Sequence, residues 1–123
     1  MTIAYRPAVE DDMRFIIETT AKVRWPHGST FRDWRAVTEV EMRRQLAEGG
    51  AAWVAEAGGV LLGFAMTRAD RALSMLYVKR DFRGAGIGLE LVNAAGADVA
   101  RAVAPTPSLL AWIKFHGRWP VAA

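Results

Sequence analysis

The segment YVKRDFRGAGIG, residues 77–88, constrains the fold of this chain more than any other. The apolar stretch ALSMLYV at residues 72–78 runs into it, and apolar residues at helical spacing follow it. This pattern predicts a buried strand, a glycine-rich turn and an amphipathic helix. Such a turn presents consecutive backbone N–H groups beside the positive end of a helix dipole. We therefore expect a phosphate-binding turn in which Gly84, Gly86 and Gly88 let a ligand approach closely.

The glycines alone leave a second interpretation open. A glycine pattern of this kind also occurs in plain strand-to-helix turns, where glycine serves only close packing. Arg83 stands where its guanidinium could reach a bound phosphate or brace the turn.

The remaining periodicity predicts an α/β (α+β) fold with elements in the order β-α-α-β-β-β-α-β-α. The expected strands are 2–7, 51–57, 60–69, 72–78 and 99–105, and the expected helices are 10–24, 33–48, 87–96 and 108–116. A helix continued to residue 104 competes with the strand at 99–105. Gly58-Gly59 predicts a hairpin turn between two of the strands. The strand at 72–78 is apolar on both faces, so we expect it to be central.

Helix 33–48 has only a weak apolar stripe. We expect Val37, Val40 and Leu46 to form its buried face.

Composition limits the classes of function. The 123 residues suit one domain, 1–123. There is no cysteine, which excludes disulfides, zinc fingers and thiol nucleophiles, and we expect no metal site. No apolar run approaches the roughly 20 residues that span a bilayer, so we expect no membrane partner and a cytoplasmic location. The net charge of +3 suits an anionic ligand.

The stretch LYVKRDFRGAGIGLELV resembles the acyl-CoA signature of the GNAT superfamily of N-acetyltransferases, Arg/Gln-x-x-Gly-x-Gly/Ala. Arg83, Gly86 and Gly88 satisfy every specified position. The opening YRPAVEDDMRFI is similar to the usual start of such domains, and the likeness extends over residues 3–96.

The resemblance implies a GNAT fold with a mixed central sheet of about five to six strands, shortened at the C-terminus. It implies acetyl-CoA as acyl donor and direct attack by an amine of a small molecule, peptide or nucleobase. The donor would pair its pantetheine arm with Leu76, Tyr77 and Val78. Its pyrophosphate would bind the amides of Arg83, Gly84, Ala85, Gly86, Ile87 and Gly88.

The catalytic groups depart from the family pattern. Family members often use a tyrosine on the last helix as general acid, whereas the only tyrosines here are Tyr5 and Tyr77. Ser108, His116 and Glu56 are the remaining candidates, although a packing histidine and a surface carboxylate are simpler interpretations. A non-catalytic GNAT-fold module that acts through protein or nucleic-acid contacts is therefore the alternative.

A loop rich in arginine and aromatic residues, 24–35, separates the first two helices. We expect Trp25, His27 and Arg32 to bind the acceptor, because the family uses this region for that purpose. Trp25 and Trp34 could instead anchor the loop to the core. The hypothesis of a nucleic-acid partner is based on this loop alone.

Only RWPVAA follows Gly117, where family members usually add strands. The exposed sheet edge expected there could pair in a homodimer. Abbreviated domains of this kind resemble those of phage genomes.

Overall fold

One antiparallel sheet organises the part of the chain that the computed structural model describes, residues 2–26, 28–98 and 101. Its strands lie in the order β1-β2-β3-β4 and are Ala4–Pro7, Ala51–Ala57, Val60–Thr67 and Leu73–Val78. The helices are α1 (Glu10–Val23), α2 (Phe31–Ala47) and α3 (Ile87–Ala95), with a 3₁₀ turn, η1, at Arg80–Phe82. The fold is α+β, and these elements follow the predicted order through the helix after the glycine-rich turn.

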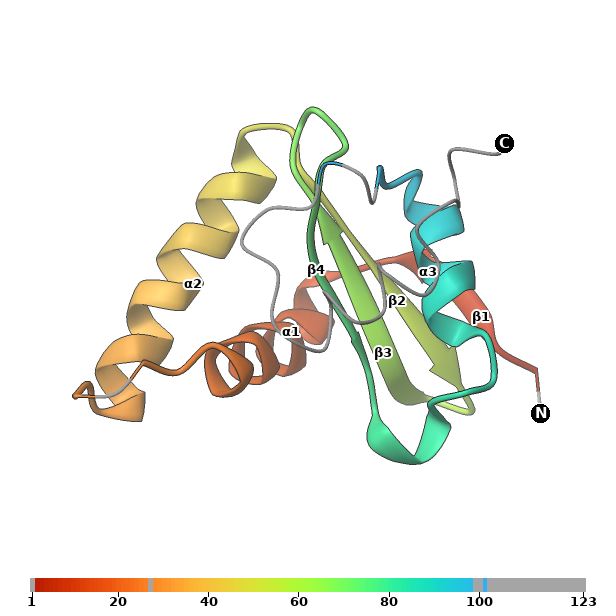
Figure 1. Ribbon diagram of the computed structural model, residues 1–123, viewed down its shortest axis with the longest axis horizontal. Coiled ribbons are helices and arrows are strands. Elements are labelled where there is room, and N and C mark those ends of the chain that lie inside the picture. Colours follow the sequence, from red (N-terminus) through yellow and green to blue (C-terminus); the bar gives the residue numbers. More distant parts are fainter. Residues whose placement is uncertain (1, 27, 99–100, 102–123) are drawn as a thin grey trace.

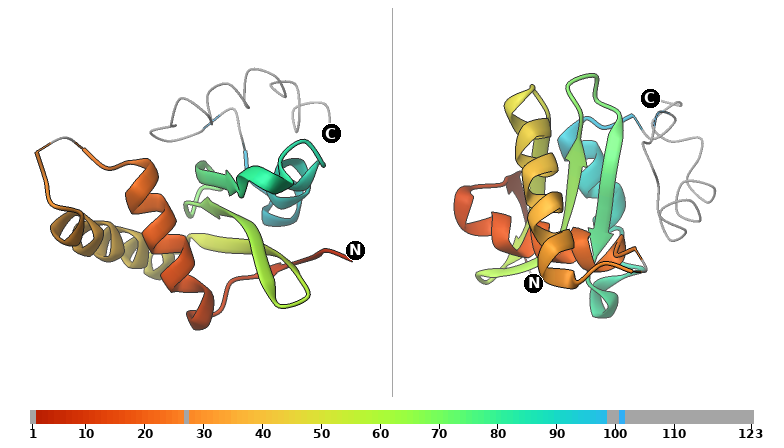
Figure 2. Two further views of the ribbon diagram at one scale, coloured as in Figure 1. Left: turned by 90° about the horizontal axis from the view of Figure 1, so that it is seen from below. Right: turned by 90° about the vertical axis from the view of Figure 1, so that its left-hand side faces the viewer.

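The sheet is covered on both faces. Helices α1 and α2 lie on one face and α3 lies on the other, as Figures 1 and 2 show. Ile16 of α1 packs with Phe64 of β3 on the first face. Leu91 of α3 packs with Leu62 of β3 on the second. Leu62 and Phe64 are two positions apart and face opposite sides because the register between β2 and β3 shifts at Ala55/Glu56, next to Leu62. Strand β3 therefore contributes to both cores and supports its neighbour β4.

The start of α1 is tied to the sheet by Arg6. Its guanidinium pairs with Asp12 at 2.7 Å and with Glu56 of β2 at 3.3 Å. Asp12 also accepts the N–H of Val9 at 2.8 Å, which caps the helix. The hydrogen bond from Arg6 is the main reason that the pKa of Asp12 lies below its usual value. The Arg-Pro opening and the acidic helix entry thus form one structural unit.

Helix α2 differs from the prediction in its start and in its buried face. It begins two residues earlier, at Phe31, because the hydroxyl of Thr30 accepts the N–H of Asp33 at 3.2 Å. The expectation that Val37 and Val40 are buried is wrong, since they are 57% and 70% exposed. The buried residues of α2 are instead Thr38 and Met42. The helix has 17 residues, and no helix in the described part is long and apolar enough to cross a membrane.

Strand β4 is the last strand of the described sheet and not a central one. On its outer side, a single parallel bridge joins Ala72 to Asp98 within the described residues. Of the strand predicted at 99–105, only Arg101 is described, and its N–H donates to Asp98 O at 3.2 Å, which makes a turn. Helix α3 ends before Gly96 as predicted, so the competing helix to residue 104 is interrupted there. The helix predicted at 108–116 lies outside the described residues.

Candidate active site

The C-terminal end of β4 is held firmly where it enters the glycine-rich turn. The N–H of Lys79 donates to Leu62 O at 2.8 Å. Arg83 returns to the strand, because its Nε donates to Val78 O at 2.8 Å and its guanidinium lies 5.7 Å from the centre of the Tyr77 ring. Arg83 therefore braces the turn against β4.

At two positions of the turn, glycine is required by the backbone conformation and not by close packing. Gly84 and Gly86 have φ angles of 84° and 82°, which disfavour other residues. A Cβ atom added to either would meet no atom within 4 Å. Open space therefore lies over the turn, and close packing does not account for these two glycines. Gly88 differs, since it is buried inside the first turn of α3.

The turn can bind an anion through its backbone. Residues 83–86 are all exposed, and none of the N–H groups of Gly84, Ala85 and Gly86 donates to a backbone carbonyl in the described structure. The turn leads directly into α3, whose first N–H groups also lack partners within the helix. Free N–H groups at a helix N-terminus favour phosphate.

The outer edge of β4 can take up an extended chain. Leu76, Tyr77 and Val78 are half-buried and pair on their inner side with β3. On the outer side no described strand pairs with them. Gly63 of β3 lets the strands approach, because a Cβ atom there would lie 2.4 Å from Tyr77 O. Main-chain groups at a free strand edge bind extended ligands in the manner of an added strand.

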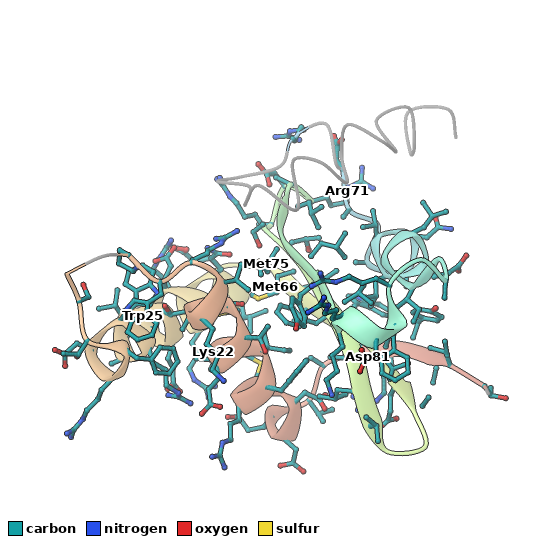
Figure 3. The ribbon with its side chains drawn as sticks, turned by 60° about the horizontal axis from the view of Figure 1, so that its bottom comes forward. Lys22, Trp25, Met66, Arg71, Met75 and Asp81 are labelled. Carbon is teal, nitrogen blue, oxygen red and sulfur yellow. The ribbon has the colours of Figure 1, made fainter. Side chains whose placement is uncertain are left out.

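A small cavity lies beside the first half of β4, between that strand, α1 and α2. Its volume is about 160 Å³, and Ser74 and Met75 of β4 contribute to its wall. Across the cavity are Thr20 of α1 and Thr38 of α2, together with Arg24, which follows α1. Figure 3 shows the side chains of Met66 and Met75 close together in the interior, with Trp25 well away from them.

Of the residues predicted to bind the acceptor, the two that the structure describes, Trp25 and Arg32, do not line this cavity. Trp25 is 48% exposed, donates through Nε1 to Ser29 O at 2.9 Å and packs against Phe31. Arg32 is exposed, and His27 lies outside the described residues. The expectation for these three residues stays a prediction. Trp34 anchors the loop instead, because its Nε1 donates to Ala21 O at 3.0 Å.

The one predicted catalytic residue within the described part of the chain, Glu56, does not lie at the edge of β4. Glu56 lies on β2, with β3 between it and β4, and pairs with Arg6. Ser108 and His116 lie outside the described residues. The described residues also contain no group of three acidic, histidine or cysteine side chains that could hold a metal ion.

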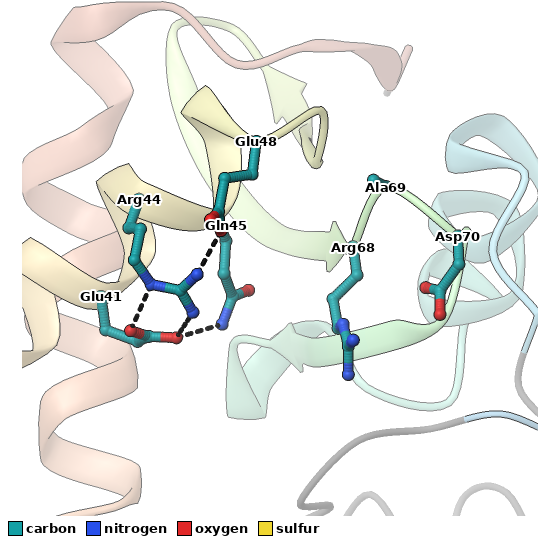
Figure 4. A pocket seen from close by; sticks show the side chains of 7 residues that line it. All are labelled: Glu41, Arg44, Gln45, Glu48, Arg68, Ala69 and Asp70. Atoms are coloured by element: carbon teal, nitrogen blue, oxygen red, sulfur yellow. Dashed lines mark hydrogen bonds and ion pairs between the residues drawn. The ribbon is translucent and has the colours of Figure 1, made fainter.

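A larger, more polar cavity of about 390 Å³ lies between the end of α2 and the turn before β4 (Figure 4). Its charges are mostly neutralised by one another. Arg44 pairs with both Glu41 and Glu48, and its hydrogen bond lowers the pKa of Glu41 to about 2. This turn precedes β4, whereas the glycine-rich turn follows it, so the two lie at opposite ends of the strand.

Comparison with known proteins agrees with this geometry. The family model "Acetyltransferase (GNAT) domain" matches residues 19–107. No curated protein sequence matches the chain.

Several solved structures share the fold. A GCN5-related N-acetyltransferase from Ralstonia eutropha JMP134 is 22% identical with a TM-score of 0.68, covering 97% of this chain and 94% of its own. A protein from Clostridium acetobutylicum described as a predicted acetyltransferase, solved with acetyl-CoA, is 15% identical with a TM-score of 0.61, covering 94% of this chain and 89% of its own. The enzyme AAC(6')-Iy, in complex with a bisubstrate analogue, CoA-S-monomethyl-acetylneamine, is 20% identical with a TM-score of 0.65, covering 95% and 88%.

Proposed function

Because the chain belongs to the GNAT acetyltransferase domain family, we propose that it transfers the acetyl group of acetyl-CoA to an amine of a small acceptor. The observation that carries this proposal is the open glycine-rich turn, whose unpaired N–H groups stand at the end of a strand with a free edge. Similar folds occur in proteins solved with acetyl-CoA or with a CoA-containing analogue, which supports the choice of donor.

In this proposal the donor binds mainly to backbone. Its pyrophosphate accepts hydrogen bonds from the amides of residues 84–88, where the positive end of the α3 dipole stabilises the charge. The N–H of Arg83, which the sequence pattern includes, donates instead to Arg80 O at 3.3 Å. Its pantetheine arm extends along Leu76, Tyr77 and Val78. The thioester then lies beside the first half of β4.

The chemistry is a direct acyl transfer. The lone pair of the neutral amine attacks the carbonyl carbon of the thioester, and a C–N bond forms. The C–S bond breaks with its electron pair on sulfur, and the proton lost by the amine nitrogen balances the thiolate. Holding the two reactants in the right geometry can account for much of the rate enhancement, because it removes the entropic cost of their encounter.

Two measurements test the proposal. Acetyl-CoA at about 100 times its dissociation constant should raise the free energy of unfolding by roughly 2.7 kcal/mol. A panel of amines should then release free CoA thiol in the presence of the protein. The absence of any thermal shift with millimolar acetyl-CoA would remove the basis of the proposal. A shift without transfer to any amine would favour a module that binds the donor and does not catalyse.

A further inference from the structure

The cavity beside β4 contains polar groups that lack partners in the described structure. Thr20 and Thr38 are 4% and 7% exposed, and neither hydroxyl has a hydrogen-bond partner there. The Nε of Arg24 is likewise buried and without a partner. All three residues line the same cavity. Buried polar groups are nearly always paired in proteins, so three unpaired groups around one space indicate a ligand that supplies acceptors.

The charge of Arg24 indicates what kind of acceptor fits. Its Nη2 donates to Ser74 O at 2.5 Å, which fixes the guanidinium against β4. No carboxylate pairs with it among the described residues, and burial lowers its pKa. Glu41 also lines the cavity, but its carboxylate is held by Arg44 and Gln45. An arginine fixed in this way and left without a counter-ion matches a carboxylate of the ligand.

The size of the cavity limits the ligand. Its volume of about 160 Å³ is close to that of a protein cavity of about 150 Å³ that holds benzene, which has six non-hydrogen atoms. The thioether side chains of Met42, Met66 and Met75 form its apolar wall. A short hydrocarbon chain between two polar ends therefore suits the space.

The cavity also lies where an acceptor is needed. Ser74 and Met75 line it, and they directly precede Leu76, the first residue proposed to pair with the pantetheine arm. A ligand in the cavity can therefore present its other end to the thioester. This step rests on the function proposed above.

We propose that this cavity is the acceptor subsite and that the acceptor is a small amino carboxylate whose carboxylate binds Arg24, Thr20 and Thr38. The free amine attacks the thioester, and the products are the N-acetylated amino carboxylate and CoA. About six or seven non-hydrogen atoms fit a cavity of this volume, which corresponds to alanine, β-alanine or γ-aminobutyrate.

The test compares each amino carboxylate with its amide, which keeps the amine and the chain but removes the negative charge. L-alanine, β-alanine and γ-aminobutyrate are each paired with the matching amide, and release of CoA thiol and the mass of the product are measured. We expect the value of kcat/KM for the carboxylates to exceed that for the amides by about 10- to 100-fold, the range for a hydrogen bond to a charged group. Equal rates for both members of every pair would overturn the proposal.

Variants identify the residues responsible. Thr38→Val removes a hydroxyl that has no partner in the described structure, so it should leave thermal stability unchanged while lowering kcat/KM for the carboxylate by about 5- to 10-fold. Arg24→Met should abolish the preference for carboxylate over amide. The matched controls Thr19→Val and Arg14→Met lie on α1 outside the cavity. They should change neither kcat/KM for the carboxylate nor the preference for carboxylate over amide.

The outcomes separate this inference from the proposed function. Failure of acetyl-CoA to bind refutes the proposed function and the inference together. Normal acetyl-CoA binding with no preference for carboxylates refutes the inference alone. A preference that survives both Arg24→Met and Thr38→Val also refutes it, because the carboxylate is then recognised elsewhere.

Discussion

Replacement of Gly86 by glutamate should abolish donor binding without unfolding the protein. Gly86 has a φ angle of 82°, and a Cβ atom there meets no atom within 4 Å, so the substitution costs backbone strain and no clash. That strain is about 1–2 kcal/mol. Gly59 provides a matched control, since its φ angle is 80° and its Cβ would also meet nothing within 4 Å. Both variants should therefore lose the same stability.

The expected shifts follow from the length of the chain. An unfolding entropy of about 2.1 cal/mol/K per residue gives roughly 0.26 kcal/mol/K for 123 residues. Backbone strain should then lower the melting temperature by about 4–8 °C in both variants. Acetyl-CoA at about 100 times its dissociation constant should raise it by about 10 °C in the unsubstituted protein and in Gly59→Glu.

Gly86→Glu should show no rise with the ligand. A carboxylate about 4 Å from the pyrophosphate repels it by about 4 kcal/mol at an effective dielectric constant of 20, close to 1,000-fold in affinity. Glutamine has nearly the size of glutamate but no charge, so Gly86→Gln distinguishes the effect of charge from that of bulk. It should bind acetyl-CoA more tightly than Gly86→Glu. Differential scanning fluorimetry measures the melting temperatures, and isothermal titration calorimetry measures the affinity for acetyl-CoA. An unchanged acetyl-CoA affinity in Gly86→Glu would show that the turn does not bind the pyrophosphate.

Two further substitutions test the framework around the site. Gly63→Ala should destabilise the protein by about 1–3 kcal/mol in urea unfolding, because the new Cβ would lie 2.4 Å from Tyr77 O, and an unchanged midpoint would contradict this close approach. Asp12→Asn should cost about 1.5–3 kcal/mol at pH 7. The pKa of Asp12 is lower in the folded protein than in the unfolded chain, where it is about 3.9. The stability that the Asp12 carboxylate contributes is therefore complete above that unfolded value and is lost as pH falls through the folded one. The difference in free energy of unfolding between the unsubstituted protein and Asp12→Asn should therefore narrow below about pH 4. A difference that does not depend on pH would argue against the ion pair with Arg6.

The conformation of the two glycine turns could be predicted because its signals are local. Gly58 and Gly59 both adopt positive φ angles in the hairpin, as two adjacent glycines between apolar strands indicate. Gly84 and Gly86 do the same in the turn before α3. In each case the conformation depends on residues within a few positions, so a short stretch of sequence contains the necessary information.

The buried face of α2 could not be predicted in the same way. Val37 and Val40 are apolar but exposed, whereas Thr38 is buried. Trp34, Thr38 and Met42 follow one another at four-residue spacing, and Trp34 is held by Ala21 O of α1. Ion pairs of Arg35 with Glu18 and of Arg43 with Glu10 also join α2 to α1. These tertiary contacts favour the orientation in which Thr38 and Met42 face inward, in spite of the weak apolar pattern of the helix.

The proposed acceptor subsite depends on contacts between residues distant in sequence, which explains why sequence reasoning alone did not single it out. Arg24 and Ser74 are 50 positions apart, and their hydrogen bond closes one side of the cavity. Thr20 is buried in α1, and only the structure shows that its hydroxyl has no partner among the described residues. The arginine and aromatic residues between the helices form a local cluster in the sequence, whereas the polar residues of the cavity come from three separate segments. In the proposed arrangement the donor binds to backbone and the acceptor to side chains, so the two sites can change independently. Substitutions at Thr20, Arg24 and Thr38 would then alter which amine is acetylated, while the glycine-rich turn would still bind the donor.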